Sequence, residues 1–558
     1  MPVHLPTLRL RRAILHAVTA VALASVHAQA QGTATVPPSD PAYLDFDRLS
    51  DLGYLDSTIV AQRPYSRREI GRILRVARDR STQLGERGQS LLVTDQELLI
   101  GDGILRRLET RFSREIAEDP STDALLALDD ARMVVHYTDA PSRPFVGTFG
   151  TPLEATMGTL LPRRLGLAYV PGWTLGVESG QRLEATSWLA FQLRERAEYA
   201  WAKDTALEKG TAEILLGTMR ARYRNVALDV GREELSWAQS IDEGLFIAAD
   251  APALDQISIS SDEPFVMPGV LRWLGPTKAV IVVADLGPSD VRSHSKLLGY
   301  KVSILPSNRT ELGATFLNHY GGEGGRPSSF GNRLIDFLPF VDIFRKHNYA
   351  DSSDVDSDKA LGVDGRFRIG GLRGVVVTGE LLIDDFDVHR IPQLFTGYGS
   401  QALGITLPRL FSPLLSLKLT AKHMGIITYT HTVLTNGFTT RDKLLGDELG
   451  PDAKAFGARL TWQPSAEFRL SLEGRSAIHS NAEYVAFYAD PENQDYVVRK
   501  TARTADELRD RLGANALVQL EAGPSFSLRF VTQRTRNFEF QGFRRTDSAA
   551  ELSAHVPF

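Results

Sequence analysis

The sequence predicts a mainly β protein, in which a large antiparallel outer-membrane β-barrel of about 16–18 strands follows a small α-helical bundle. Three observations support this fold class. The chain begins with a secretory signal, and apolar residues alternate with polar ones from about residue 130 onward. The same alternation runs through residues 551–558 to Phe558. One face of such a strand can touch lipid while the other faces water.

Residues 1–30 are expected to be a signal peptide. Three arginines precede a short, mostly apolar run over residues 13–26, and residues 28–30 (AQA) fit a small-x-small cleavage site. The apolar run is too short for a membrane-spanning helix. Residues 31–40 are polar and contain proline, so we expect a flexible leader there.

Residues 41–125 are expected to form a periplasmic helical bundle. Ser66 and Glu69 form a capping box, and the apolar residues that follow share one helix face. Thr94 and Glu97 form a second capping box, and a shorter helix is expected over 41–55. The arginine-rich face of the helix after Ser66 is interpreted as solvated surface.

Residues 130–558 are expected to form the barrel. Alternation is clearest at residues 415–422, 456–463, 468–473 and 525–530. Tight turns such as 305–308, 463–466 and 522–525 join these strands, and short turns belong on the periplasmic side. Charged residues at period two, such as Arg194 and Arg220, are expected to face the lumen or the rim.

Composition excludes several classes of protein. The chain has 558 residues, no Cys and a formal net charge of −5. The lack of Cys excludes a disulfide scaffold. The mildly negative net charge lacks the basic character that is typical of nucleic-acid-binding proteins. The chain has no His-Glu-x-x-His, Gly-x-Ser-x-Gly or Gly-Lys-Ser pattern, so we expect no enzymatic activity, no cofactor and no metal site.

Several ordered sequence blocks resemble the Wzi family of capsule-assembly proteins. They include DRLSDLGYLD at 47–56, QRPYSRRE at 62–69, GREELSW at 231–237, SSDEPF at 260–265, GGEGG at 321–325 and LGPD at 449–452. The blocks span nearly the whole mature chain in family order. After Trp237 the chain reads AQS, where a Gly-Pro-Gly-like turn is expected from the family.

This resemblance implies an outer-membrane barrel, typically of eighteen strands, with its helical N-terminal region in the periplasm. It implies lectin-like binding that retains capsular polysaccharide or another exopolysaccharide at the cell surface. The partners implied are the polysaccharide, outer-membrane lipid, and a periplasmic or export-machinery protein for the helical bundle. Nucleic acid is not among them.

Residues in or next to these blocks have the chemistry that a polysaccharide needs. Aromatic rings stack on sugars, amides bind hydroxyls, and guanidinium groups pair with carboxylates. The candidate binding residues are Arg232, Glu233, Trp237, Asn318, His319, Arg326, Asn436 and Arg441. For Trp237 a packing role is the favoured interpretation, and Arg232 and Glu233 could equally belong to a lumenal hydrogen-bond network.

Two other functions stay open on the sequence. A general porin or solute channel would share the barrel, and a barrel hydrolase would need Ser, His and a carboxamide to meet at the rim. The helical bundle favours the polysaccharide binder over a plain porin, by fold-level analogy.

Overall fold

The structure is a computed structural model that describes most of the chain after residue 33. The described residues are 34–55, 58–87, 95–117, 124–146, 152–157, 160–161, 170–240, 244–325, 357–370, 373–384, 398–431, 434, 436–480, 482–490, 495–502, 505–521 and 523–558. The expected signal peptide, Thr94 of the second capping box and the candidate Arg326 lie outside them.

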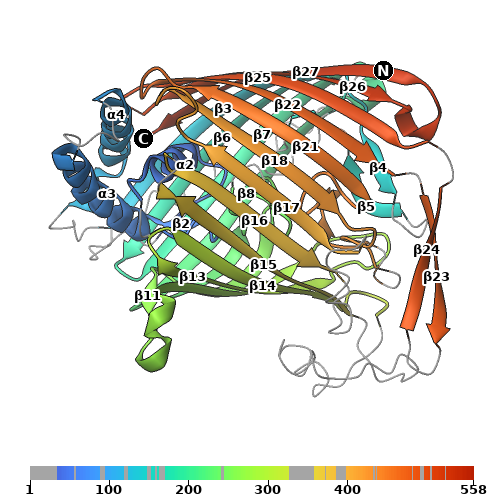
Figure 1. The fold of residues 1–558 in the computed structure, drawn as a ribbon, viewed down its shortest axis with the longest axis horizontal. Coiled ribbons are helices and arrows are strands. Elements are labelled where there is room, and N and C mark those ends of the chain that lie inside the picture. Colours follow the sequence, from blue (N-terminus) through green and yellow to red (C-terminus); the bar gives the residue numbers. More distant parts are fainter. Residues whose placement is uncertain are drawn as a thin grey trace, which may run out of the picture.

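A closed antiparallel barrel of 18 strands forms the body of the molecule (Figure 1). This confirms the predicted fold class and lies at the upper limit of the predicted strand number. In order around the barrel the strands are β3 (Leu125–Thr138), β6 (Gly172–Thr186), β7 (Leu189–Ala202), β8 (Lys209–Tyr223), β9 (Val226–Glu233), β10 (Leu254–Ser261), β12 (Pro276–Asp285), β13 (Lys296–Ser307), β14 (Thr310–Tyr320), β15 (Ser357–Ile369), β16 (Val375–Ile383), β17 (Ser400–Leu407), β18 (Leu415–Met424), β21 (Ala453–Trp462), β22 (Phe468–His479), β25 (Glu507–Gln519), β26 (Ser525–Arg536) and β27 (Arg544–Pro557). Strand β27 closes the barrel on β3, with Ala549 opposite Thr138 and Pro557 opposite Asp130.

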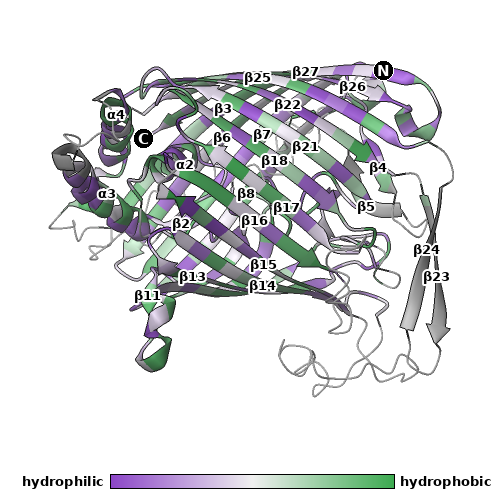
Figure 2. Cartoon of the chain, in the orientation of Figure 1, coloured by the Kyte–Doolittle hydropathy of each residue, from purple (hydrophilic) through white to green (hydrophobic). Residues whose placement is uncertain are grey.

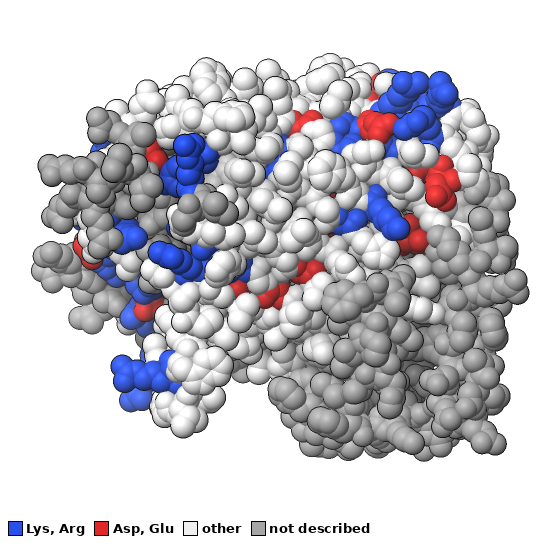
Figure 3. Space-filling model, viewed as in Figure 1, with Lys and Arg blue, Asp and Glu red and all other residues white. Residues whose placement is uncertain are grey.

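The two faces of each strand follow the alternation in the sequence. On β27, Leu552 is 50% exposed on the outer wall, whereas His555 is 4% exposed and points into the lumen. Apolar and polar residues alternate along the strands in Figure 2, and most of the visible outer wall in Figure 3 is uncharged. An apolar outer wall is what a strand-built membrane protein needs.

Short connections gather at one end of the barrel, which also carries the helices (Figure 1). We call it the helical end. The turns after β13, β21 and β25, which the sequence predicted to be tight, all lie there. At the opposite end lie longer connections with small elements: β4 (Arg143–Val146), β5 (Pro152–Met157), η1 (Thr205–Leu207), β19 (Thr439–Thr440), β20 (Lys443–Leu444), β23 (Ala482–Asp490), β24 (Asp495–Ala502) and η5 (Phe538–Phe540).

The helical bundle consists of α2 (Ala42–Leu52), α3 (Arg67–Arg87), α4 (Asp95–Arg111) and α5 (Ser113–Ile116). The Ser66 hydroxyl accepts the Glu69 N–H at 3.1 Å, which confirms Ser66 as the N-cap, whereas the Glu69 carboxylate binds Arg72 at 2.8 Å. The apolar faces of the bundle form one core with the turns of the barrel, since Ala466 belongs to it. Among the described helices, none combines the length and the apolar character that a membrane span requires.

The arginine-rich face of α3 is not simply solvated surface, as the sequence had indicated. The Arg67 guanidinium is buried and pairs with Glu115 at 2.7 Å and with Asp129 at 2.5 Å. Arg68 pairs with Glu263 at 2.5 Å. These carboxylates lie at or beside barrel strands and on α5, so the arginines join the bundle to the barrel.

The described part of the expected flexible leader, residues 34–40, is buried inside the barrel. Thr35–Val36 forms strand β1, which pairs with β2 (Tyr65–Ser66). The Thr35 N–H donates to the Gln192 amide oxygen at 3.1 Å, and Gln192 donates back to the Thr35 carbonyl at 2.6 Å. The segment therefore has partners on the barrel wall, which a polar composition could not indicate.

At the opposite end the lumen is filled by folded-in loops. We call segments 234–240, 244–253, 425–431 and 436–452 the loop plug. Its apolar residues pack on one another and on inward-facing barrel residues such as Val282, Leu297 and Leu317. Backbone hydrogen bonds from Trp237 to Ile247 and from Ala248 to Leu445 hold its segments together.

Candidate functional site

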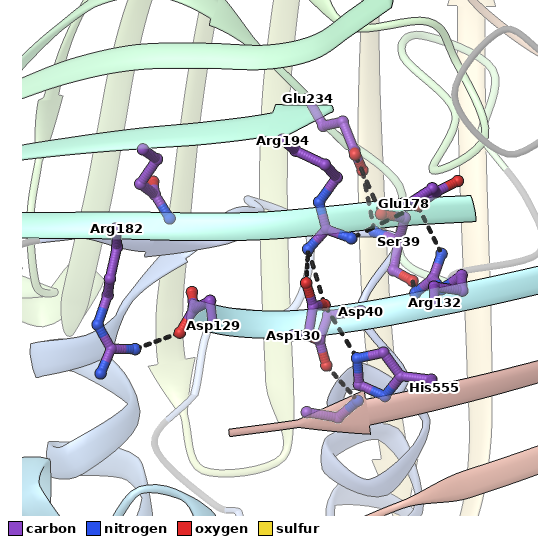
Figure 4. Close-up of polar contacts among 12 residues, drawn as sticks. Ser39, Asp40, Asp129, Asp130, Arg132, Glu178, Arg182, Arg194, Glu234 and His555 are labelled. Carbon is purple, nitrogen blue, oxygen red and sulfur yellow. Dashed lines mark hydrogen bonds and ion pairs between the residues drawn. The ribbon is translucent and has the colours of Figure 1, made fainter. Parts of the chain in front are cut away.

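The lumen next to the helical end holds a buried network of charged side chains (Figure 4). The Arg194 guanidinium on β7 contacts both carboxylate oxygens of Asp130 on β3, at 2.9 and 2.8 Å. His555 Nε2 on β27 lies 2.9 Å from the same carboxylate. Buried charges are stable only when they are paired in this way. Period two in the sequence correctly placed Arg194 in the lumen.

The same network holds the leader against the wall. The Asp40 carboxylate accepts two hydrogen bonds from the Arg111 guanidinium group on α4, at 2.7 and 2.6 Å. Ser39 donates from its N–H and its hydroxyl to Glu234, both at 3.0 Å. We call Ser39, Asp40, Asp130, Arg194, Glu234 and His555 the leader network.

Two carboxyl groups of the network outside the strands titrate differently. Burial raises the pKa of Glu234 to about 7, against the lowering effects of the Arg194 charge and the Ser39 hydrogen bonds. For Asp40, burial acts in the same direction, but the Arg111 guanidinium outweighs it and holds the pKa well below its usual range. Asp40 is therefore charged at neutral pH, whereas Glu234 is partly protonated.

Asp40, Asp130 and His555 offer ligand atoms within 4.8 Å of one another. Oxygen and imidazole ligands suit a divalent cation. However, Arg111 and Arg194 already neutralise both carboxylates. A further cation would meet two guanidinium groups, so the cluster fits a structural ion-pair network better than a metal site.

A cavity of about 210 Å³ lies in the lumen between the leader, the loop plug and strands β18, β21, β22, β25 and β26. Its lining combines cationic and acidic side chains, namely Lys418, Lys422, Arg459, Arg475, Arg511 and Arg529 with Asp40, Asp250, Asp447, Glu448 and Glu473. Pockets for drug-sized ligands measure roughly 300–1,000 Å³, so this cavity has room for one small polar group.

Two carboxylates in this cavity are each shared between two arginines, and one of them, Glu473, lies 3.0 Å from Arg459 and 3.6 Å from Arg529. Glu448 lies 2.5 Å from Arg475 and 3.3 Å from Arg511. Although burial raises the pKa of Glu448, the charges of Arg511 and Arg475 outweigh it and lower the pKa to about 2. Arg475 and Arg511 therefore face a carboxylate that is charged at neutral pH, and the sequence alone gave no signal for this arrangement.

The structure brings two predicted binding residues together at the opposite end of the barrel. Arg232 binds both carboxylate oxygens of Asp255 at 2.7 Å, and Arg441 lies 4.0 Å from the same carboxylate. We call Arg232, Asp255 and Arg441 the rim cluster. All three side chains are partly exposed, and Asp255 lies at the end of the outward face of β10 that also carries Ile257 and Ile259.

Two other predicted residues converge on Ser295. His319 Nε2 lies 2.9 Å from the Ser295 hydroxyl, and the Asn436 amide lies 3.4 Å from it. All three side chains are buried, as is the predicted Asn318. This contact joins β14 to the loop plug and leaves no surface at which a bound molecule could reach the serine.

The remaining predicted residues lie elsewhere. Trp237 is 1% exposed and packs within the loop plug, close to Gly299. The carboxylate of Glu233 accepts the Thr35 hydroxyl at 2.8 Å, so it holds the leader. The structure does not join either residue to the rim cluster.

Fold and site together define a transmembrane β-barrel of the outer membrane whose lumen is occupied by its own leader and loops. Residues 166–538 match the sequence profile of the capsule assembly protein Wzi family, which is more than half of the chain. The chain belongs to this family, as the resemblance of its sequence blocks predicted.

A solved structure agrees on the fold. Wzi of Escherichia coli, described as an outer-membrane protein involved in group 1 capsule assembly and a carbohydrate-binding β-barrel, superposes with a TM-score of 0.63. The identity is 15%, and the alignment covers 94% of this chain and 99% of that chain. OccD3 (OpdP) of Pseudomonas aeruginosa gives a TM-score of 0.43 at 10% identity, over 78% of this chain and 91% of that chain.

A curated relative is similar in sequence over a shorter region. It is an uncharacterized 55.8 kDa protein in the cps region of Klebsiella pneumoniae, 26% identical over 168 residues. The match covers 29% of this chain and spans about a third (32%) of that relative's length.

Proposed function

We propose that this protein is a lectin-like barrel that binds surface polysaccharide, capsular or otherwise extracellular, and retains it on the cell. The observation that carries the proposal is the match to the capsule assembly family over residues 166–538. The carbohydrate-binding description of the structurally similar E. coli Wzi supports it. In this proposal the protein holds the polymer without transforming it.

The rim cluster is the proposed contact with the polymer. Among the predicted binding residues that the structure describes, Arg232 and Arg441 are the two whose guanidinium groups meet at a partly exposed carboxylate. Guanidinium groups bind carboxylates and hydroxyls of sugars through fixed donor geometry. A glycan carboxylate could compete with Asp255 for the same donors.

The helical bundle is proposed to face the periplasm, where it would meet a protein of the export machinery. Support comes from the short turns at the helical end, since bacterial barrels keep their short turns on the periplasmic side. The exposed part of α3 carries Arg78, which pairs with Glu109 at 2.7 Å and is 56% exposed, so an acidic partner would compete with Glu109 for its guanidinium group.

The general porin is the competing function, and the filled lumen counts against it. The leader and the loop plug occupy the interior from its two ends. An 18-stranded barrel is wide enough for an aqueous channel only when loops leave it open. We expect the protein to conduct few ions in planar bilayers, and a large steady conductance would favour the porin.

The barrel hydrolase receives little support. The Ser295–His319 pair is the kind of contact that activates a serine nucleophile, but both side chains are buried. A bound ester would have to displace the loop plug to reach the hydroxyl.

The deciding experiment measures cell-bound and released polysaccharide in strains with and without the gene. Complementation uses the wild type, Arg232→Ala/Arg441→Ala, and Arg536→Ala as a matched control. Arg536 forms an exposed pair with Asp510 at 3.1 Å, at the same end of the barrel as the rim cluster. Immunoblots confirm equal amounts of each barrel.

We expect polymer to move to the medium without the gene and with the double variant, but not with Arg536→Ala. If the strain without the gene loses polymer but the double variant retains it, the rim cluster is not the contact with the polymer. Unchanged cell-bound polymer in the strain without the gene would refute the retention function itself.

A further inference from the structure

One connection at the helical end is unlike its neighbours. Between β10 and β12 the chain forms the short strand β11 (Phe265–Val266), which pairs with the start of β12, and then the 3-10 helix η2 (Gly269–Leu274). In Figure 1 this segment extends beyond the outline of the barrel. We call residues 265–274 the spur.

The spur exposes an unusual concentration of large apolar side chains. Val270 is 86% exposed, the highest value for a large apolar side chain among the described residues, and Trp273 is 70% exposed. Phe265, Val266 and Leu271 are exposed as well. Five large apolar side chains are thus exposed within ten residues, and a concentration of this kind marks an interaction site.

The base of the spur is held firmly. The Asn225 side chain donates to the Glu263 carbonyl at 2.9 Å and accepts the Glu263 N–H at 2.8 Å. Arg68 of α3 binds the Glu263 carboxylate. At the other side, Gly275 has a positive φ of 72° and lies so close to the Leu305 carbonyl that a Cβ would clash at 1.9 Å. The apolar tip is therefore held away from the barrel in a fixed position.

The spur continues the lipid-facing surface of the barrel. Ile257 and Ile259 on β10 and Ile281 on β12 are exposed on the outer wall below it. At the same end, the neighbouring turns expose Trp188 and Tyr223. Aromatic residues in such a ring mark the boundary between hydrocarbon and headgroups.

We propose that the spur is a membrane-interface anchor that inserts into the lipid leaflet at the helical end of the barrel. Val270, Leu271 and Trp273 enter the boundary between headgroups and acyl chains. Arg272, the cation of this segment, meets lipid phosphates, since a guanidinium pairs with phosphate and a charged residue beside Trp is typical of interfacial segments. The spur then limits the tilt of the barrel in the bilayer.

This assignment follows from the continuity of the spur with the lipid-facing wall, and it does not depend on the bound polysaccharide. A periplasmic protein or a second copy of the chain could also cover an apolar surface. Neither would explain why the spur lies at the level of the aromatic turns, so both are outcomes that the experiment distinguishes.

The test uses the absence of Cys in the natural sequence. Val270→Cys, labelled with a nitroxide, is placed in phosphatidylethanolamine–phosphatidylglycerol nanodiscs as the full mature protein. Collision rates with oxygen, which concentrates in lipid, and with a water-soluble nickel chelate report its surroundings. Leu528→Cys on the lipid-facing wall of β26 and Thr82→Cys on exposed α3 serve as lipid and water controls.

We expect the ratio of oxygen to nickel collisions at Val270 to match that at Leu528. A ratio like that of Thr82 would overturn the proposal. Protection from both reagents would also overturn it, in favour of a protein contact. A second reporter is Leu271→Cys combined with Val270→Ser and Trp273→Ser. Its ratio of oxygen to nickel collisions should be lower than that of Leu271→Cys alone, because two apolar side chains that enter the lipid are removed. The three side chains are exposed, so the variants should fold like the wild type.

Discussion

Two parts of the chain fill the lumen of this barrel, and different interactions hold each of them. Near the helical end the leader network consists of paired charges and hydrogen bonds around Asp130 and Arg194. At the opposite end the loop plug is an apolar core around Trp237. A polar network fixes a segment in one arrangement, because each partner must be satisfied. An apolar core tolerates small adjustments but depends on volume.

The largest expected effect comes from Trp237→Ala in the loop plug. Removing a fully buried indole leaves a cavity and should lower the free energy of unfolding by roughly 4 kcal/mol. Heat-modifiability on gels and circular dichroism in detergent measure the loss of stability. Trp188→Ala, at an exposed turn, is the control and should change stability by less than about 1 kcal/mol. Equal losses in both variants would contradict the buried role.

Arg194→Ala tests the leader network. It leaves the Asp130 carboxylate buried without its guanidinium, which should cost about 3 kcal/mol. The exposed pair of Arg536 and Asp510 supplies the control, where loss of the arginine should cost about 0–1 kcal/mol. We also expect Arg194→Ala to raise bilayer conductance by freeing the leader, and an unchanged conductance would mean that the loop plug alone closes the lumen.

Thr35→Val removes a smaller part of the same network. The Thr35 hydroxyl donates to Glu233, and it also lies 2.8 Å from the Gln192 amide oxygen. Losing this buried hydrogen bond should destabilise the protein by roughly 1–2 kcal/mol, because the buried Glu233 carboxyl group loses a partner. Limited proteolysis of the leader is the readout. Protection equal to the wild type would show that the β1–β2 pairing holds the leader without this side chain.

The smallest effect is the pH dependence of Glu234. Its folded-state pKa of about 7 is above the value in an unfolded chain, so the folded state binds more protons between these two values. Its stabilising contribution is complete at acid pH and is lost as pH rises through 7, by at most about 1.4 kcal/mol per pH unit. Asp40, whose pKa is lowered, contributes in the opposite direction and only below its usual range.

Thermal unfolding between pH 5.5 and 8 measures this dependence, and Glu234→Gln is the comparison. The difference in unfolding temperature between the wild type and this variant should shrink toward acid pH, where Glu234 is protonated. A slope that persists unchanged in Glu234→Gln belongs to another group.

The sequence predicted the parts of the fold that rest on local pattern. Alternation at 415–422 and 525–530 became strands β18 and β26, and the N-cap at Ser66 starts α3. It missed the burial of the leader, because the partners of Thr35 and Ser39 lie 157 and 195 residues further along the chain. Polar composition indicates a loop only when no distant partner exists.

The candidate site was predicted less well, for the same reason. Residue type selected Arg232 and Arg441 as candidates, but their meeting at Asp255 depends on loop geometry that no periodicity reveals. Residue type also selected His319 and Asn436, which are buried contacts within the molecule. The cavity arginines on neighbouring strands appear in the sequence only as ordinary lumen-facing charges.

The pairing of Asp130 with His555 has a consequence for biogenesis. These residues are 425 positions apart, on the first and the last strand of the barrel. Contacts of such separation form late, because the intervening chain must first be organised. The leader network is complete only after the seam between β3 and β27 has closed, because one of its members lies on each of the two strands.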